Sequence, residues 1–314
     1  LGNTTGAAAR TSAFGNPDLK AEMGTELEVG FEASALRDRV GMDVTFYDKR
    51  TSDMLQSVAV APSLGFIGSR LTNLGEVTNR GIEAVLFGVP IERARFRWDT
   101  RLNLASNRNR LVSFGIPGRT VETPGGQPYG AVQQHRPGYP LGGFWVTPPL
   151  RCGVDALAPT AATTGPNACR YNRGEAQLTA AGAAIFSPGD TARRYFGSSV
   201  PTIEAGFSNT FTLFRSIRVY ALLDYKGGFK VFNFQERNRC QAANDNCARV
   251  NDPRARFPQT PGDTILNREL AVYRSASITP EWIQDGDFVK LRELSLSIDI
   301  PQRYLRATRT RSAT

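Results

Sequence analysis

The sequence predicts an all-β chain, with about seven long strands of a larger antiparallel transmembrane β-barrel and long loops at one end. Three observations support this fold class. Long segments alternate apolar with polar residues, which places the two kinds of side chain on opposite faces of a strand. Very short and very long connections join these segments in turn, as in transmembrane barrels. No stretch approaches the roughly 18 consecutive apolar residues that a membrane helix needs.

The clearest alternation lies between Glu22 and Tyr47. Its apolar residues are Leu27, Val29, Phe31, Ala33 and Ala35, and after a turn at 36–39 Val40, Met42, Val44 and Phe46. Each half persists for about ten residues, the length that a tilted strand needs to cross a hydrocarbon layer. Strands of soluble proteins are usually about 5–6 residues long. A long soluble hairpin remains the alternative interpretation.

The same alternation recurs along the rest of the chain. We expect strands at 26–36, 40–50, 80–89, 95–106, 202–213, 217–227 and 288–300. Short connections fall at 36–39, 90–95 and 214–217, and long ones at about 51–78, 108–201 and 228–287. Within the second long connection, 139–146 is expected to form a hairpin arm, and 155–189 to be a loop. Loops of this length are uncommon in compact soluble domains.

Composition agrees with a barrel wall and disfavours several other classes. Hydrophobic residues make up 40% of the chain, which fits strands with one face toward a wet lumen. The net charge is +9, from 38 basic and 29 acidic residues, and only 5 of the basic residues are lysine. Their scattered distribution disfavours nucleic-acid binding. A compositional preference for arginine explains the excess, and acidic lipopolysaccharide is a candidate partner.

Four cysteines form two local pairs, Cys152 with Cys169 and Cys240 with Cys247. Neither pair has the C-x-x-C spacing of a zinc site, and His135 is the single histidine, so no metal site is predicted. Pairs within Gly- and Asn-rich loops predict disulfides in an oxidising compartment. Free thiols and the two other connectivities remain alternatives.

The sequence predicts no catalytic or cofactor-binding residues. The acidic residues that invite a paired-carboxylate interpretation are Glu26, Glu28, Glu32 and Asp43. The alternation already explains them as polar-face residues. His135 lacks a nucleophile motif, and the glycine pairs at 125–126 and 227–228 are expected in turns because no helix follows them.

Four segments, in chain order, resemble TonB-dependent outer-membrane receptors of the SusC/RagA branch. They are Asn16–Glu22 (N-P-D-L-K-A-E), Asn73–Glu83 (N-L-G-E-V-T-N-R-G-I-E), Gly138–Phe144 (G-Y-P-L-G-G-F) and Asp285–Leu296 (D-G-D-F-V-K-L-R-E-L-S-L). The resemblance covers essentially the whole chain. It implies that residues 1–314 belong to one barrel domain, without the plug, the TonB box or the final strands of such a receptor. The chain begins at Leu1 and is expected to be an internal piece, about strands fourteen to twenty of a barrel of about 22.

The resemblance also implies a function. It is TonB-dependent import of an oligosaccharide or peptide nutrient across the bacterial outer membrane, with a SusD-like surface lipoprotein and TonB as partners and no enzymatic activity. A passive porin-like channel or surface adhesin is the alternative, and a secreted soluble carbohydrate-binding β-protein is a second one.

Aromatic residues in the expected outward loops are the candidate substrate contacts. They are Tyr139, Phe144, Trp145 and Trp282, although packing within the loops would also explain them. Phe96 and Trp98 follow a short turn, where an aromatic girdle of a barrel would lie; core packing is the alternative there.

Overall fold

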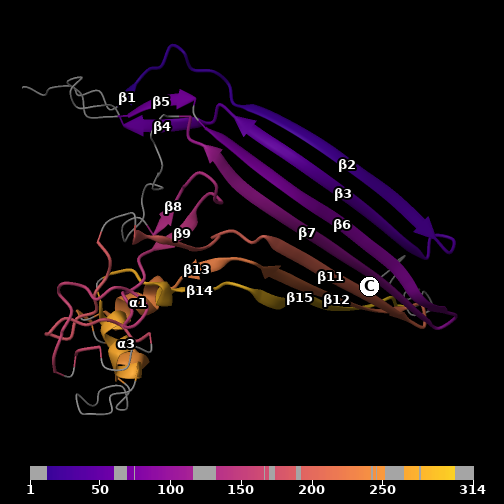
Figure 1. Ribbon diagram of the computed structural model, residues 1–314. Helices are drawn as coiled ribbons and strands as arrows, with labels where there is room; N and C mark the ends of the chain where they lie inside the picture. The colour runs from indigo at the N-terminus through magenta and orange to yellow at the C-terminus, as the bar shows by residue number, and fades with distance from the viewer. Residues whose placement is uncertain are drawn as a thin grey trace, which may run out of the picture.

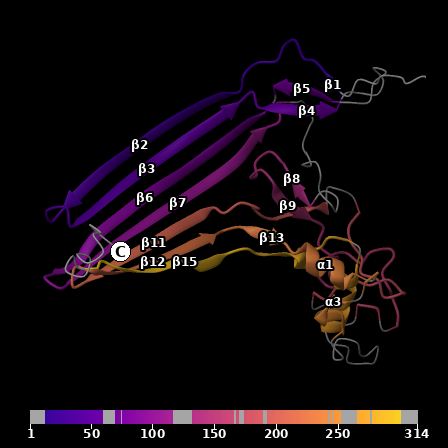
Figure 2. The ribbon, with the colours of Figure 1, turned by 180° about the vertical axis from the view of Figure 1, so that it is seen from behind.

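The main element of the computed structural model is a seven-stranded antiparallel sheet, in the order β15-β12-β11-β7-β6-β3-β2, which Figures 1 and 2 show from opposite sides. Its strands are β2 (Met23–Ala35), β3 (Val40–Ser52), β6 (Glu76–Arg93), β7 (Phe96–Ser113), β11 (Ile203–Leu213), β12 (Ile217–Gly227) and β15 (Phe288–Ile298). The structure describes residues 13–59, 69–73, 75–115, 132–165, 167–169, 174–188, 192–241, 243–244, 246–251, 265–275 and 277–300. The glycine pair at 125–126 lies outside these residues.

All seven expected strands are present; β2 and β3 are slightly longer than the sequence pattern indicated, and β6 and β7 are much longer. β6 and β7 are 18 residues each, whereas 80–89 and 95–106 were expected. The polar run Asn107–Arg110 obscured the continuation of β7, and Glu76–Asn79 that of β6. These extensions pair with each other, Thr78 with Arg110 and Arg80 with Arg108, so the sheet continues beyond its apolar part.

Tight turns gather at one end of the sheet and long connections at the other (Figure 1). We call these the turn end and the loop end. Leu36, Arg37 and Asp38 in the first turn, and Phe214 and Arg215 in the third, have positive φ angles between 51° and 64°. Such left-handed turns match the right-handed twist of the strands they join, although non-glycine residues adopt this conformation at a cost.

A bulge in β15 explains why its apolar residues depart from two-residue periodicity. Leu291 pairs with Leu223 and Glu293 with Leu222, which leaves Arg292 as the extra residue. Leu291 and Leu294 are three residues apart and still lie on the same face of the sheet. The expected strand 288–300 starts at the same residue as β15, and its simple alternation is regular only after the bulge.

Two aromatic side chains cover glycines on the neighbouring strand. Tyr47 stands opposite Gly81, and Phe87 opposite Gly41. A Cβ added at Gly81 would lie 2.5 Å from Cζ of Tyr47, and one at Gly41 would lie 2.7 Å from Cε2 of Phe87. The rings therefore occupy the space that side chains at 81 and 41 would need.

Smaller elements fill the loop end, shown at the left in Figure 1. One small sheet consists of β1 (Ala13–Phe14), β5 (Ser69–Asn73) and β4 (Leu55–Ala59). A second consists of β10 (Arg194–Gly197), β9 (Gly143–Val146) and β8 (Gln133–Gln134). The third pairs β13 (Lys230–Phe232) with β14 (Ile283–Asp285). The helical elements are α1 (Phe234–Cys240), α2 (Ala248–Asn251), α3 (Ile265–Arg274) and η3 (Pro280–Trp282). The sequence pattern predicts none of these helices, and 228–287 was expected to be a long connection.

Candidate functional site

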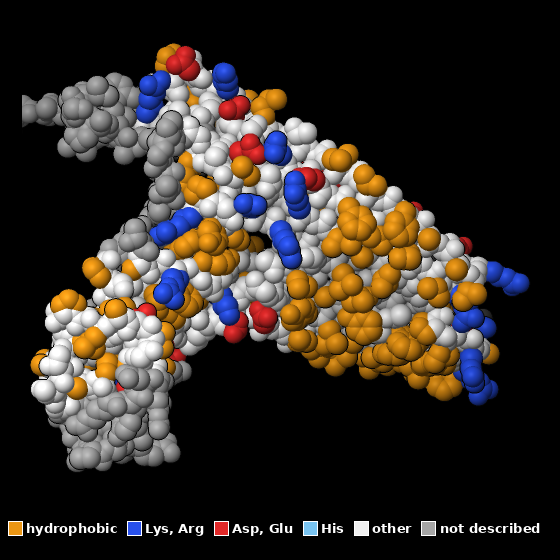
Figure 3. All heavy atoms as spheres, in the orientation of Figure 1, with side chains coloured by type: hydrophobic (Ala, Val, Ile, Leu, Met, Phe, Trp, Pro, Cys, Tyr) orange, Lys and Arg blue, Asp and Glu red, His pale blue; other side chains and the backbone are white. Residues whose placement is uncertain are grey.

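The strand register separates the large sheet into two chemically different faces. The apolar face carries the alternating hydrophobic residues of all seven strands, and row by row these residues stand opposite one another, as with Phe31 and Val44, Leu86 and Leu102, and Phe207 and Leu223. Many of them are exposed, including Leu27 at 66% and Leu294 at 66%. The large sheet therefore presents one continuous hydrophobic surface (Figure 3).

The opposite, polar face is lined by charged residues that form ion pairs, most of them between neighbouring strands and one, Arg97–Asp99, within β7. The pairs are Lys49–Glu26 (3.0 Å), Arg97–Glu92 (2.8 Å), Arg97–Asp99 (2.8 Å), Lys226–Glu204 (2.8 Å), Arg218–Asp299 (3.3 Å) and Arg292–Asp224 (2.6 Å). Each such exposed pair contributes little stability. Together they make this face hydrophilic from the turn end to the loop end.

The four acidic residues that the sequence suggested as paired carboxylates all lie on the polar face. Glu26 is held by Lys49, Glu28 stands opposite Tyr47, and Glu32 stands opposite Asp43. Glu28, Glu32 and Asp43 are exposed. No enclosed apolar pocket surrounds them among the described residues, so their setting is that of a hydrated surface.

Polar side chains of the sequence segments quoted above connect separate parts of the chain at the loop end. The Asn73 side chain accepts a hydrogen bond from the Lys20 backbone N–H and donates one to the Lys20 carbonyl, both at 2.7 Å. Asn16 donates to the Leu71 carbonyl at 2.9 Å. Asp287 accepts from the Gly228 backbone N–H at 2.9 Å. These contacts fix where each connection leaves the sheet.

The Gly138–Phe144 segment continues the sheet beyond the start of β11. Leu111 of β7 donates to the Tyr139 carbonyl at 2.9 Å and accepts from the Gly138 N–H at 2.7 Å. The Asn109 side chain accepts from the Leu141 N–H at 2.8 Å. This attachment holds the loop that carries Tyr139 against the upper part of β7.

An aromatic cluster forms directly above this attachment. The rings of Tyr139, Trp145 and Tyr195 have centroids 4.7–5.5 Å apart, and the Arg136 guanidinium lies 4.1 Å from the Trp145 ring centroid. Tyr139 is 40% exposed, whereas Trp145 is 5% exposed. Burial, with a smaller contribution from Tyr139, raises the pKa of the Tyr195 phenol above its usual value.

Of the four candidate substrate contacts, the structure leaves only the Tyr139 ring substantially exposed. Phe144 packs with Val132 and Val146, and Trp282 packs against the disulfide cysteines of the third long loop. Trp145 is covered by the other members of the aromatic cluster. Sequence reasoning did not include Tyr195 or Arg136, because neither lies in a periodic segment and their proximity to Trp145 depends on the fold.

Both local cysteine pairs are joined in the structure. The Cα atoms of Cys152 and Cys169 are 5.6 Å apart, and those of Cys240 and Cys247 are 5.0 Å apart. The second disulfide packs directly on Trp282. Each disulfide therefore closes a short loop within one of the two long connections.

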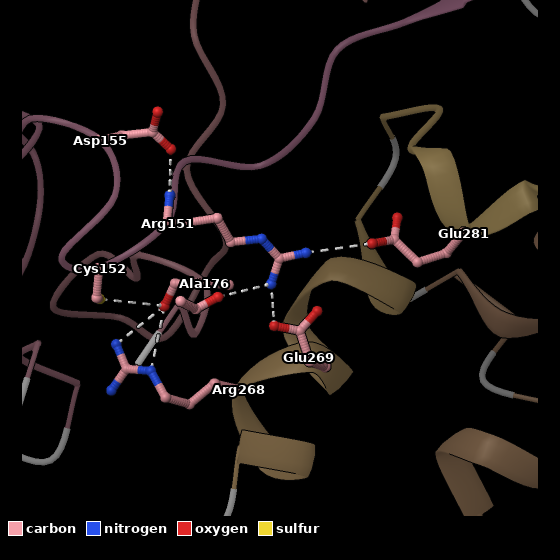
Figure 4. A network of polar contacts seen from close by, with 8 residues as sticks. Arg151, Cys152, Asp155, Ala176, Arg268, Glu269 and Glu281 are labelled. Atoms are coloured by element: carbon pink, nitrogen blue, oxygen red, sulfur yellow. Dashed lines mark hydrogen bonds and ion pairs between the residues drawn. The ribbon is translucent and has the colours of Figure 1, made fainter. Parts of the chain in front are cut away.

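Two arginines bind these long connections to each other (Figure 4). Arg151, beside the first disulfide, forms ion pairs with Glu269 of α3 and with Glu281 of η3. Arg268 of α3 is 8% exposed and donates to the carbonyls of Asn167, Ala168 and Ala176. The described residues of 132–200 and 228–287 are thus connected to each other, and we call them the loop layer.

The described residues contain neither a metal-binding cluster nor a membrane-spanning helix. No group of three or more His, Cys, Asp and Glu side chains there is placed to hold a metal ion. No described helix is long and apolar enough to cross a membrane.

Comparison with known proteins identifies the family. The model of the TonB dependent receptor-like beta-barrel family matches residues 1–246. This chain belongs to that family, and its seven-stranded sheet is part of the wall of such a barrel.

Individual relatives agree with this assignment. TonB-dependent receptor P3 of Formosa agariphila is 24% identical over 300 residues, which cover 94% of this chain and 29% of that protein. TonB-dependent receptor SusC of Bacteroides thetaiotaomicron is 28% identical over 152 residues, 46% of this chain and 15% of that protein. The solved structure of the RagAB peptide transporter superposes with a TM-score of 0.67 at 20% identity, covering 92% of this chain and 30% of that one. The chain spans less than a third of the length of these relatives.

Proposed function

We propose that the full-length protein is an outer-membrane receptor that imports a nutrient, an oligosaccharide or a peptide, in a TonB-dependent manner. Residues 1–314 would supply part of one barrel domain, and the remaining wall and the plug would lie elsewhere in the full-length chain. The observation that carries this proposal is the separation of one apolar from one polar face over seven adjacent strands in a member of this barrel family.

The size of the apolar face suits a membrane. β11 has 11 residues, about 36 Å of extended strand, and a tilt of about 45° reduces this to about 25 Å along the membrane normal. An outer-membrane barrel has an apolar band about 25 Å tall. The apolar face would then contact lipid, the polar face would line the lumen, the loop end would lie outside the cell and the turn end in the periplasm.

The loop layer is the part of this chain best placed to meet a substrate. Tyr139 offers an exposed ring beside Trp145, Tyr195 and Arg136, which could stack on a sugar ring or on a peptide side chain. Because Arg151 and Arg268 join the two long connections, the loop layer would offer a preformed surface. A SusD-like lipoprotein would dock over it, and TonB would act on the plug from the periplasm.

Uptake measurements test the proposal. A strain of the source bacterium lacking the full-length gene should lose uptake of one labelled class, either oligosaccharides or peptides. Complementation with the wild-type gene should restore uptake only when TonB is functional. Tyr139→Ala should raise the substrate concentration for half-maximal uptake by about tenfold if one ring stack is lost, while Tyr139→Phe should retain most of the affinity.

The alternatives give different results in the same experiment. Uptake that persists without TonB indicates a passive channel. Unchanged uptake in the deletion strain, together with a loss of adhesion, indicates an adhesin. Either result would contradict the proposed import function.

A further inference from the structure

Four arginines lie where the apolar face ends toward the loop end. By register, one row across β3, β6 and β7 consists of Arg50, Thr78 and Arg110, and the adjacent row consists of Asp48, Arg80 and Arg108. The next row toward the turn end contains Phe46 and Ile82 of the apolar face. We call Arg50, Arg80, Arg108 and Arg110 the arginine patch. Figure 3 shows Lys and Arg side chains beside the hydrophobic surface on this side of the sheet.

The arrangement of the patch is unfavourable for the sheet by itself. Arg80 and Arg108 stand directly opposite each other, and like charges in this position destabilise a strand pair. Asp48 pairs with Arg80 at 2.9 Å, and Glu76 pairs with Arg50 at 3.0 Å. These two acids balance only two of the four positive charges.

The remaining two arginines have no such acidic partner in the part of the chain that the structure describes. Arg108 and Arg110 are exposed, and neither has an ion pair or side-chain hydrogen bond with any residue that the structure describes. The side chains of Arg50 and Arg80 are also 61% and 67% exposed. The patch therefore presents exposed guanidinium groups with a net positive charge at the border of a hydrophobic surface.

We propose that the arginine patch binds the phosphate groups of a membrane phosphoglycolipid of the lipopolysaccharide class. Guanidinium groups bind phosphate through paired hydrogen bonds. Neighbouring strands are about 4.8 Å apart and alternate residues about 6.7 Å apart, so guanidinium groups from three strands can surround one head group. Its acyl chains would lie along the adjoining apolar face. This proposal rests on the membrane location proposed above.

The test measures lipid binding by the full-length receptor in detergent. Bisphosphorylated lipid A is titrated and bound copies are counted by native mass spectrometry. Arg108→Gln/Arg110→Gln should bind about 30-fold more weakly than the wild type, because each arginine near an anionic head group contributes about a factor of five. Arg93→Gln/Arg95→Gln is the matched control, since it removes two exposed arginines at the turn end and should bind like the wild type.

A variant that binds lipid A more tightly excludes misfolding as the explanation of weaker binding, because a misfolded protein would not gain affinity. Asp48→Asn removes a negative charge from the patch and frees Arg80 from its ion pair, so lipid A should bind about fivefold more tightly. Lipid A without phosphates should bind poorly to every variant, and inorganic phosphate should compete only at much higher concentration.

Three outcomes would overturn the phosphoglycolipid site: equal binding of dephosphorylated lipid A, equal weakening in the control variant, or no effect of Asp48→Asn. The result is separate from the test of import. A receptor that inserts into the membrane and imports its substrate but ignores these substitutions disproves only the lipid site. A receptor that binds lipid A as expected but imports nothing disproves only the import function.

Discussion

Asn209 is a polar residue in the middle of the apolar face. Its side-chain oxygen accepts a hydrogen bond from the Trp98 indole at 2.9 Å, and it is 8% exposed. In the expected strand 202–213, Asn209 interrupts an apolar set that otherwise runs Ile203, Ala205, Phe207, Phe211 and Leu213. Trp98, considered in the sequence only as a girdle or core residue, supplies the donor that lets Asn209 remain there.

This pair can be tested by a double-mutant cycle. Trp98→Phe should destabilise the folded barrel in lipid vesicles by about 1–2 kcal/mol, because the Asn209 amide oxygen loses its partner in an apolar environment. Asn209→Leu should leave the indole N–H unpaired at a similar cost. The double variant Trp98→Phe/Asn209→Leu should lose less than the sum of the two, as measured by denaturant unfolding. Strict additivity would show that the two residues do not interact.

Tyr195 gives a pH-dependent prediction outside the strands of the large sheet. Since burial raises the pKa of its phenol, the folded state favours the neutral form more than the unfolded state does. Its contribution to stability is therefore complete below the unfolded-state pKa and is lost as the pH rises through the folded-state pKa. The absorbance at 295 nm reports tyrosine ionisation, and subtracting the titration of Tyr195→Phe from that of the wild type isolates Tyr195. The midpoint of this difference should lie at a higher pH than the midpoint of an exposed tyrosine. A midpoint at or below that value would contradict this environment.

At the scale of single elements, the β15 bulge permits a sharp test of register. Deleting Arg292 removes the extra residue and leaves Leu291 and Leu294 two positions apart, so both stay on the apolar face. Deleting Ser295 instead places Leu294 beside Leu296 and moves half the strand to the wrong face. The folded fraction in membranes, measured by heat-modifiable migration, should be retained largely in the first variant and be lost in the second. Equal loss in both would mean that the barrel needs the bulge itself.

The loop layer should depend on the shape of the Arg268 side chain. Arg268→Met leaves the carbonyls of Asn167, Ala168 and Ala176 without their donor, and Arg268→Lys keeps the charge but not the planar fork. Both should make the loop layer more sensitive to external protease, Met more than Lys, while the sheet remains intact. The readout is the rate of cleavage within 132–200 and 228–287 on whole cells. Unchanged cleavage in both variants would show that the disulfides alone hold these segments.

The sequence predicts the strands well because one local property determines them. Two-residue alternation identified all seven strands, and the expected strand 288–300 begins where β15 does, although a bulge interrupts the alternation at Leu291–Leu294. The helices could not be found in this way. α3 uses Arg268 and Glu269 to contact a segment about 100 residues earlier in the chain, so the reason for its position is not contained in its own pattern. The aromatic cluster of Tyr139, Trp145 and Tyr195 could not be predicted for the same reason, because its members come together only in the folded chain.

For the whole molecule, the two sheet edges determine how the chain behaves alone. β2 and β15 each pair with one neighbour in the large sheet, and unpaired edges invite association with other chains. Residues 1–314 expressed alone should therefore aggregate or require detergent, whereas the full-length barrel should be monodisperse in detergent. Sedimentation of both proteins with and without detergent measures this. A monomeric fragment in plain buffer would instead favour the soluble carbohydrate-binding alternative.

The covering of Gly41 by Phe87 has a consequence for how the family varies. The atoms nearest to a side chain at position 41 all belong to the Phe87 ring, so a larger residue there becomes acceptable once that ring has been replaced. Gly81 differs, because a Cβ there would meet the Ser106 backbone oxygen as well as the Tyr47 ring, and this glycine should persist even where Tyr47 is replaced. Substitutions at 41 and 87 should consequently arise together in diverging lineages. An alignment of homologues would reveal this as paired change at positions more than thirty residues apart.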